Sequence, residues 1–316
     1  MSEAGTMGRF ILRRVVQAVL VILAATLLIF LATFAIGDPF ASSGEKAVPP
    51  DIAAANRAKF GLDKPLPLQY VIYLGNMVRG DFGIDFEQHR PVAQMLEAAI
   101  PNTVRLALVA IVIDILIGVV AGVIAAVKRY SFWDVLVTVI ATLAIGIPVF
   151  VIGVVLVANV AGWGPFPSVP RSFTVQVPWY QEVLLPAFTL AIIDAAFIAR
   201  LMRGSMLEVL RADYIRTARA KGLSERTVIG KHAMRNSLIP VVTYVGVSLG
   251  VLFGGAIITE TIFQYNGVGY LLSTAIVKSN APVIIAVVIF SVVAYVVLST
   301  IVDILYAFLD PRIRLN

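Results

Sequence analysis

Acidic side chains inside apolar runs are the residues of this sequence best placed to do chemistry. Asp114, Asp194 and Asp303 each lie within a long hydrophobic stretch, and Glu260 closes another. A charge at the centre of a bilayer costs about 2.5–3.5 kcal/mol on insertion scales, so each acid should face a cavity, water or a partner. We therefore expect Asp194 and Glu260 to belong to a polar pathway, and Asp303 to form a structural pair or reach water.

Asp194 allows two interpretations. It lines the pathway and meets a cationic group of a passing solute, or it pairs with Arg200 or Arg203, which follow in the same apolar run. The second interpretation is preferred because ion pairs near helix ends reach water. Glu260 has a second role open to it, which is to order the loop that follows. Asp114 and Asp194 together would also suit a proton-coupled carrier.

Catalytic and metal-binding patterns do not occur in the sequence. His89 and His232 are far apart, and neither has a metal-ligand neighbour at helical spacing. The chain has no cysteine. It has no G-x-x-x-x-G-K-[ST] loop for ATP phosphates, no H-E-x-x-H and no G-x-S-x-G. We therefore expect a non-catalytic protein, with no metal site and no cofactor bound by this chain.

The composition identifies a membrane protein that crosses the bilayer several times. Of its 316 residues, 59% are hydrophobic and 14% are charged, whereas soluble domains carry about 25% charged residues. The net charge of +6 is carried largely by loops that flank the apolar runs. Anionic lipid and membrane orientation account for such charge, so no nucleic-acid partner is expected.

Six apolar runs predict six membrane-spanning helices in an all-α fold. The first has 22 residues, and about 33 Å of helix is enough to cross a bilayer and too long for a cleaved signal peptide. The distribution of Lys and Arg between the runs places both termini in the cytoplasm. The predicted spans cover residues 15–36, 104–127, 135–161, 183–202, 238–258 and 283–309.

An extracytoplasmic segment is expected between the first two spans. Residues 37–101 hold eight acidic and six basic side chains, which is not the basic bias of a cytoplasmic loop. A short helix should run from Asp51 to Phe60 and stop at Gly61. An apolar face over 68–78 predicts a second helix, which lies on the outer membrane surface or packs on its own domain. The domains would be 1–102 and 103–316.

Glycine and proline mark packing faces and breaks in these spans. Gly246, Gly250 and Gly254 recur every four residues on the fifth span, which favours close helix packing. Gly118 and Gly122 have the same spacing on the second span, where chance alone could produce it. Other signals are Asn102 or Thr103 as the cap of span two, and Pro148 and Pro186 as kinks or limits of spans three and four.

The stretch 211–240, between the fourth and fifth spans, predicts a rigid cytoplasmic projection. From Arg200 to Arg235 the chain carries nine Lys or Arg and three Asp or Glu. We expect Asp213 to cap a short helix that Gly222 ends in a left-handed conformation. Ser224 would cap a second helix, and Pro240 would allow the next span to start.

The same stretch resembles a known docking element. The pattern D-Y-x-R-T-A-x-A-K-G-L, followed by R-N-x-L-I-P, is similar to the EAA loop of the dipeptide/oligopeptide branch of ATP-binding cassette (ABC) importer permeases. Arg216 stands where the family motif has an acid. F-G-L-D-K-P-L-P-L-Q-Y, R-G-D-F-G and the closing D-P-R-I-R extend the resemblance over nearly the whole chain. It implies that these residues couple to the ATPase: Asp213, Tyr214, Arg216, Thr217, Ala218, Ala220, Lys221, Gly222, Leu223 and Ser224.

The resemblance also implies a function and a set of partners. The chain would be a multi-pass permease subunit with the type I importer fold, in a bacterial inner membrane, importing di- or oligopeptides. It would pair with a homologous permease, two ATP-binding subunits that hold ATP and Mg²⁺, and an extracytoplasmic substrate-binding protein. Related permeases carry glutathione, nickel complexes or sugars, so those cargos stay open. A proton-coupled carrier and an intramembrane enzyme are the alternatives from other classes, the second disfavoured by the missing motifs.

Overall fold

The computed structural model describes residues 3–35, 50–167 and 177–309. Within these ranges the chain is helical, and its extended structure is limited to one isolated bridge between Ile84 and Pro91. Two compact units form, one from Met1–Val104 with Asn266–Asn316 and the other from Arg105–Tyr265. We call them unit 1 and unit 2. The predicted division between residues 102 and 103 stays a prediction, because compactness alone does not define an independent domain.

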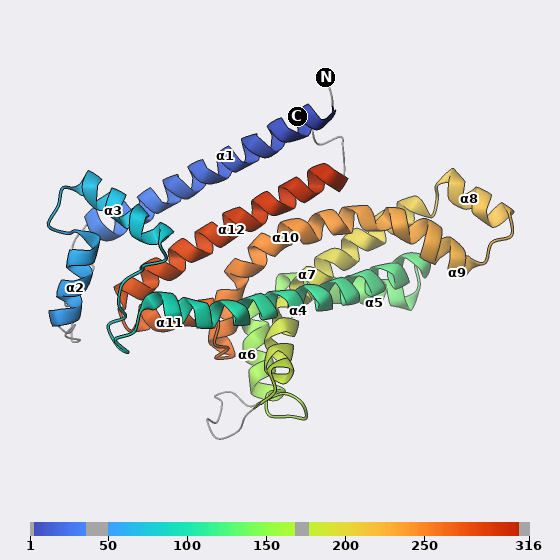
Figure 1. Cartoon of the computed structure of the whole chain (residues 1–316). Helices are drawn as coiled ribbons and strands as arrows, with labels where there is room; N and C mark the ends of the chain where they lie inside the picture. The colour runs from blue at the N-terminus through green and yellow to red at the C-terminus, as the bar shows by residue number, and fades with distance from the viewer. Residues whose placement is uncertain (1–2, 36–49, 168–176, 310–316) are drawn as a thin grey trace. The chain divides into compact units, whose positions relative to one another are not determined.

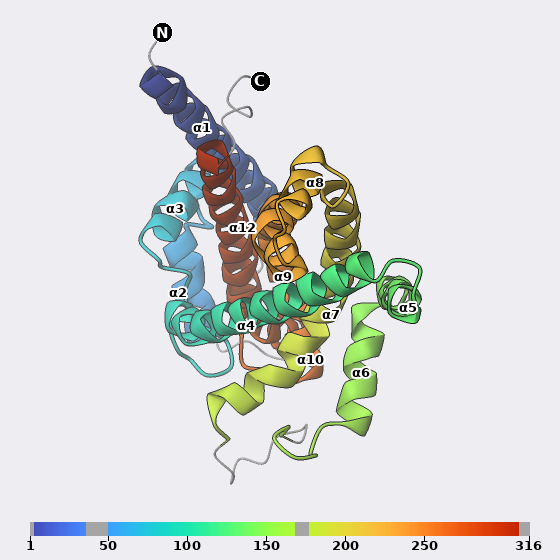
Figure 2. The same cartoon turned by 90° about the vertical axis from the view of Figure 1, so that its right-hand side faces the viewer.

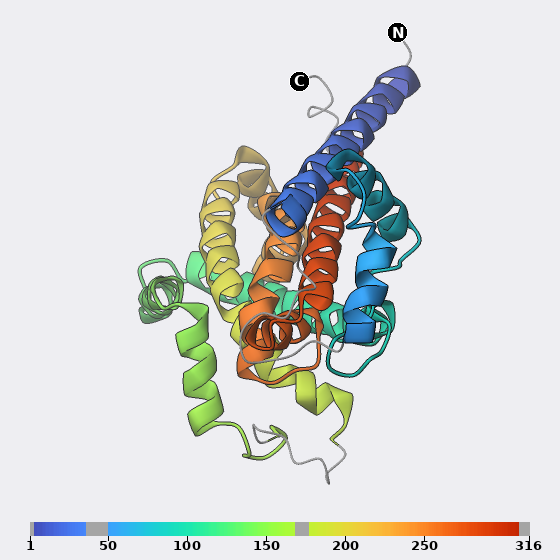
Figure 3. The same cartoon turned by 90° about the vertical axis from the view of Figure 1, so that its left-hand side faces the viewer.

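Unit 1 brings the two ends of the chain together. Its first and last long helices, α1 and α12, lie side by side (Figures 1 and 3). An aromatic and aliphatic core that includes Phe30, Tyr73 and Ile285 packs beside them. The elements of unit 1 are α1 (Glu3–Phe30), η1 (Leu31–Ala35), α2 (Pro50–Phe60), α3 (Leu66–Val78), the start of α4 (Val92–Val127), α11 (Val268–Val277) and α12 (Ala281–Leu309).

Two expectations in unit 1 are confirmed. Asp303 forms an ion pair with Arg14, Nη1 to Oδ2 at 2.9 Å, and so joins α12 to α1. The short helix α2 ends at Gly61, which has a φ of +65°. Helix α3 buries Tyr73 and leaves the apolar side chain of Val71 62% exposed. The helix therefore packs on its own unit and presents apolar groups outward, while its place on a membrane surface stays a prediction.

Unit 2 holds the projection between spans four and five. Helix α7 packs against both α5 and α10, and α6 turns away from α5 (Figure 2). The elements of unit 2 are the rest of α4, α5 (Phe132–Gly146), α6 (Val149–Asn159), α7 (Trp179–Val209), α8 (Asp213–Ala220), α9 (Glu225–Thr227), η2 (Val228–Ala233) and α10 (Met234–Ile262).

Helices α4 and α7 approach closely at two glycines. A Cβ at Gly118 would lie 2.6 Å from the Cβ of Ile198, and a Cβ at Gly122 would lie 2.7 Å from the Cβ of Met202. Real side chains do not tolerate such distances, so both positions need glycine for the helices to touch. Gly118 and Gly122 therefore form a packing face on α4, and their spacing is not a coincidence.

Among the described residues, four helices are long and apolar enough to cross a membrane: Gly8–Phe34, Val92–Val127, Trp179–Val209 and Ala281–Ile304. The predicted third span is broken into α5 and α6, which are bent by 103° and could form a fifth. Helix α10 covers the predicted fifth span, and side chains at 247 and 249–255 in it lie outside the described residues. The membrane fold is confirmed, and the number six stays a prediction.

Several predicted helix limits are wrong. Helix α4 begins at Val92, so Asn102 and Thr103 lie inside it. Asn102 Nδ2 donates to the Asn266 carbonyl, and Thr103 Oγ1 accepts the amide of Val268, the first residue of α11. Pro240 lies inside α10, because the helix is continuous from the π-helical turn η2 onward. Pro148 does break its span and stands at the N-cap of α6, whereas Pro186 lies buried inside α7. Helices α4 and α10 both begin before the residues that the local sequence signals predicted as their starts.

Candidate functional site

Helix α8 is anchored through two side chains on one face. Ile215 is fully buried and Ala218, three residues on, is 7% exposed. Residues three apart share a face of an α-helix, so this pair forms the contact surface. Both pack in a cluster with Met202, Met206 and Val228, which belong to α7 and η2. Docking of the amphipathic helix on α7 explains why so short a helix is stable.

The end of α8 is closed by a Schellman motif around Gly222. The amide of Gly222 donates to the carbonyl of Arg219 at 2.9 Å, and the amide of Leu223 donates to that of Ala218 at 3.4 Å. Gly222 has a φ of +77°, in the left-handed region that favours glycine. This confirms the predicted C-cap. The predicted N-cap is one residue off, since Ala212 occupies it and Asp213 is the first helical residue.

A second turn continues directly into α10. Ser224 is the N-cap of α9 as predicted, and its hydroxyl lies 3.0 Å from that of Thr227. The chain then passes through the π-helix η2, with Val228 and Ala233 buried, into α10. Figure 1 shows α8 and α9 together at one end of α7 and α10. The projection is therefore fixed to two long helices.

The outer surface of this projection is polar and exposed. Of the ten residues expected to couple, all except Ala218 are exposed. Arg219 Nε donates to Glu225 Oε1 at 2.7 Å across the turn, and this hydrogen bond lowers the pKa of the Glu225 carboxyl. Asn236 Nδ2 donates to Tyr214 Oη at 2.7 Å and ties α8 to α10. The exposed polar side chains leave this surface accessible to a partner.

The expected pairing of Asp194 with an arginine is wrong. The hydroxyl of Tyr244 on α10 donates to Asp194 Oδ1 at 2.6 Å. Arg200 Nη2 donates instead to Thr142 Oγ1 at 2.6 Å, and Arg203 bonds to Asp134. The cause is helix phase: Asp194 faces α10, whereas the two arginines reach α5. Whether Asp194 lines a pathway stays a prediction.

The ion pair of Asp134 with Arg203 was missed in the sequence. Two bonds join them, Nε to Oδ1 at 2.6 Å and Nη2 to Oδ2 at 2.9 Å, and the Asp134 side chain is only 5% exposed. Asp134 also accepts the Tyr130 amide at 2.9 Å. A lone acid at the start of an apolar run, just after Lys128 and Arg129, was the available signal.

Two other acids are deeply buried. Asp114 is fully buried, and neither of its carboxyl oxygens has a hydrogen-bond partner among the described residues. It lies close enough to Asp194 for the two carboxyl groups to interact electrostatically. Glu260 is fully buried near the end of α10, and its backbone carbonyl accepts the Tyr265 amide at 2.9 Å. The pathway roles of Asp194 and Glu260 stay predictions.

The predicted glycine face of the fifth span falls on α10. Gly246, Gly250 and Gly254 all lie within that helix. The surroundings of Gly250 and Gly254 lie outside the described residues. Their role in helix packing therefore stays a prediction.

Comparison with known proteins identifies relatives over nearly the whole chain. The probable peptide ABC transporter permease protein y4tP of Sinorhizobium fredii is 36% identical over 312 residues, which cover 98% of this chain and 100% of the relative. The oligopeptide transport system permease protein AppB of Bacillus subtilis is 37% identical over 320 residues, with 98% and 100% covered. The oligopeptide transport system permease protein OppB of Haemophilus influenzae is 36% identical over 313 residues, with the same shares covered.

Two family models match in succession. Residues 7–107 match the N-terminal part of the binding-protein-dependent transport system membrane component. Residues 118–315, more than half of the chain, match the binding-protein-dependent transport system inner membrane component. The second match includes the α8–α9 projection and both helices that anchor it. The chain thus belongs to the family of inner-membrane components of binding-protein-dependent transport systems.

Proposed function

We propose that this chain is one of two permease subunits of an ABC importer for di- or oligopeptides, and that α8 and the turn after it dock on an ATP-binding subunit. The names of the relatives support the cargo. The observation that carries the docking role is the projection itself. Buried Ile215 and Ala218 fix it to α7, while its outer residues are exposed.

The partners follow from this role. They are a homologous second permease that supplies the other half of the pathway, two ATP-binding subunits that hold ATP and Mg²⁺, and an extracytoplasmic substrate-binding protein. The chain itself catalyses no reaction and is surrounded by lipid in a bacterial inner membrane. Both termini and the loop 211–240 are cytoplasmic, and Lys278 belongs to an outer loop.

The anchoring contacts define how movement would be transmitted. Closure of the ATP-binding subunits on ATP displaces α8, and because Ile215 packs against Met202 and Met206, the displacement passes to α7. The continuous path from α9 through η2 passes it to α10. The two helices then move together and open the pathway outward, and ATP hydrolysis restores the inward-facing state.

Site-specific crosslinking tests the docking face. The chain has no cysteine, so Ala220→Cys can carry a benzophenone group at a single exposed position of α8. We expect illumination to join it to an ATP-binding subunit. Ser279→Cys, which is also exposed, is the matched control and should label from outside intact cells without such a product. Crosslinking from Ser279 alone would overturn the proposal.

Uptake by the reconstituted complex tests the transport role. Import of a tripeptide should need the binding protein on one side of the membrane and ATP on the side of the ATP-binding subunits. It should exceed import of glutathione, nickel complexes or sugars. Buried Asp114, beside Asp194, is the observation that favours a proton-coupled carrier instead. That function predicts uptake by this chain alone, abolished by an uncoupler, and such a result would replace the ABC assignment.

A further inference from the structure

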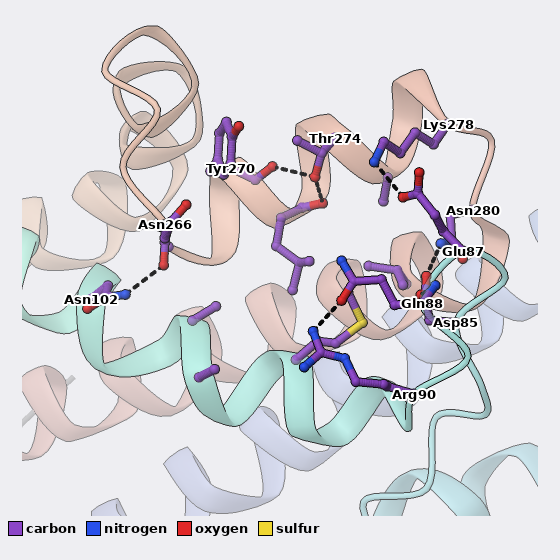
Figure 4. A pocket seen from close by; sticks show the side chains of 17 residues that line it. Asp85, Glu87, Gln88, Arg90, Asn102, Asn266, Tyr270, Thr274, Lys278 and Asn280 are labelled. Atoms are coloured by element: carbon purple, nitrogen blue, oxygen red, sulfur yellow. Dashed lines mark hydrogen bonds and ion pairs between the residues drawn. The ribbon is translucent and has the colours of Figure 1, made fainter. Parts of the chain in front are cut away.

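A cavity with both charged and apolar groups in its walls lies within unit 1. Its volume is about 530 Å³, within the range of about 300–1,000 Å³ that small-molecule sites occupy. Figure 4 shows its walls, formed by the loop before α4, by the first turns of α4, and by the segment from Asn266 through α11 to Val283. Side chains of both charges line it, namely Asp85, Glu87, Arg90 and Lys278.

The loop that supplies three of these charges is held at both ends. Asn56 is fully buried, its Nδ2 donates to the carbonyl of Ile84, and its Oδ1 accepts the Ile84 amide, both at 3.0 Å. Ile84 also forms the bridge to Pro91, on the other side of the loop. The cavity's charged side chains therefore project from a fixed ring of backbone, as a preorganised binding site requires.

The buried part of the cavity is rich in acceptors. Asp85 is 1% exposed and Asn280 is 4% exposed. Asn280 Nδ2 donates to Asp85 Oδ1, and the Gln88 amide donates to Asp85 Oδ2 at 2.5 Å. Asn280 Oδ1 is buried without a hydrogen-bond partner among the described residues. A buried carboxylate in this wall favours a cation such as an ammonium group nearby.

The rim carries an ion pair that can exchange partners. Lys278 Nζ bonds to Glu87 Oε2, and both side chains are nearly half exposed, so opening the pair costs little. Ser279, between Lys278 and Asn280, has a φ of +54°, and His89, beside Arg90, has a φ of +56°. Positive φ is uncommon in a residue other than glycine, and less so in histidine than in serine.

We propose that this cavity binds a short peptide as a zwitterion before it enters the pathway. The ammonium end pairs with Glu87, near the buried Asp85, and the carboxylate end meets Lys278 and Arg90. Lys278 and Glu87 separate, and each then pairs with the oppositely charged end of the peptide, so the charges stay balanced. Met95, Ala98 and Leu271 line the same cavity and would accept varied side chains. The inference rests on the peptide-importer function proposed above.

Protection of a single cysteine from labelling tests the proposal in the complex purified through this chain, without the binding protein. Ala98→Cys is exposed and lines the cavity, and Thr274→Cys stands on another wall as a second reporter. We expect trialanine to slow thiol labelling at both positions, and trialanine blocked at both ends to have no effect. Lys278→Gln or Glu87→Gln should raise the half-protecting concentration about tenfold, as loss of one charge-assisted hydrogen bond predicts.

Lys59→Gln is the matched control. Lys59 forms an ion pair with Asp81 at 2.5 Å in the same unit, with similar exposure, but does not line the cavity. Its substitution should leave protection unchanged. Protection by the peptide-free binding protein but not by trialanine would overturn the proposal and assign the cavity to protein docking. Absent protection with intact ATP-driven uptake overturns this inference alone, whereas absent uptake in the unsubstituted complex overturns the proposed function.

Discussion

Two helices of this protein end in the same way for different reasons. At Gly61, after α2, and at Gly222, after α8, the glycine amide bonds to the carbonyl three residues back, and the next amide bonds to the carbonyl five residues back. The φ values are +65° and +77°. Judged by backbone geometry alone, the two Schellman motifs are equivalent.

Their surroundings differ. A Cβ at Gly61 would lie 2.9 Å from Ile72 Cδ1 and 3.3 Å from Lys64 Cδ, whereas a Cβ at Gly222 would meet nothing within 4 Å. Gly61 is needed for conformation, and a side chain there would also displace the ends of the Ile72 and Lys64 side chains. Gly222 is needed for conformation alone within this chain. The open space around Gly222 is compatible with the docking role proposed for this turn.

The largest expected loss of stability is in Gly61→Val. Positive φ costs a β-branched residue about 1–2 kcal/mol, and displacing Ile72 adds to it, for a total of about 2–4 kcal/mol. Limited proteolysis should cut the segment from α2 to α3 faster than in the native chain, at unchanged membrane insertion. Equal protease resistance would mean that the packing difference between the two glycines has no energetic consequence.

The comparison extends to ion pairs, since Asp134 with Arg203 is interior and Arg219 with Glu225 is not. In Asp134→Ala, the partly buried Arg203 guanidinium loses both bonds, which costs about 1–3 kcal/mol. The melting temperature of the detergent-purified complex should fall. Adding Arg203→Met to this variant should restore part of the loss, because no unpaired charge then remains. A double variant less stable than Asp134→Ala would contradict this account.

Gly222→Val should cost less stability and more function. Only the strain of about 1–2 kcal/mol applies, because the added atoms meet nothing in this chain. The variant should insert normally but lose stimulated ATP hydrolysis or the ATP-binding subunits themselves. Gly222→Asn is the control, because asparagine tolerates the left-handed conformation and should retain more activity. Unchanged coupling in the valine variant would make Gly222 an ordinary loop residue.

The smallest effect belongs to the exposed pair of Arg219 with Glu225. The hydrogen bond from Arg219 lowers the pKa of Glu225 from its usual 4.5, so the pair stabilises the folded turn at neutral pH. That stabilisation is lost as the pH falls below 4.5 through the lowered pKa. Hydrogen exchange of the 219–227 segment, corrected for intrinsic rates, should differ slightly between native chain and Glu225→Gln at pH 7, and the difference should vanish on acidification.

The sequence predicted the features that depend on local chemistry. The left-handed Gly222, the N-cap at Ser224, the stop at Gly61 and the break at Pro148 follow from rules that act within a few residues. The pairing of Asp303 was also expected, although its partner Arg14 was not named. Those predictions needed no knowledge of which helices are neighbours.

Features that depend on neighbouring helices could not be predicted in the same way. Asp194 bonds to Tyr244, 50 residues away, and Arg203 bonds to Asp134, 69 residues away. Such partners depend on which face of each helix meets which neighbouring helix. A single sequence does not specify that arrangement. The cavity of unit 1 was missed for the same reason, because Glu87 and Lys278 are 191 residues apart.

The construction of unit 1 from both ends of the chain sets an order on biosynthesis. Domains ordinarily fold as they leave the ribosome, N-terminal part first. Here α1 emerges early, but its main packing partner α12, and Asp303 with it, follow only after all of unit 2 has been made. Until α12 has been synthesised, α1 lacks this packing partner and Arg14 cannot form its ion pair with Asp303. Chains that stop before α12 therefore leave α1 without its main packing partner.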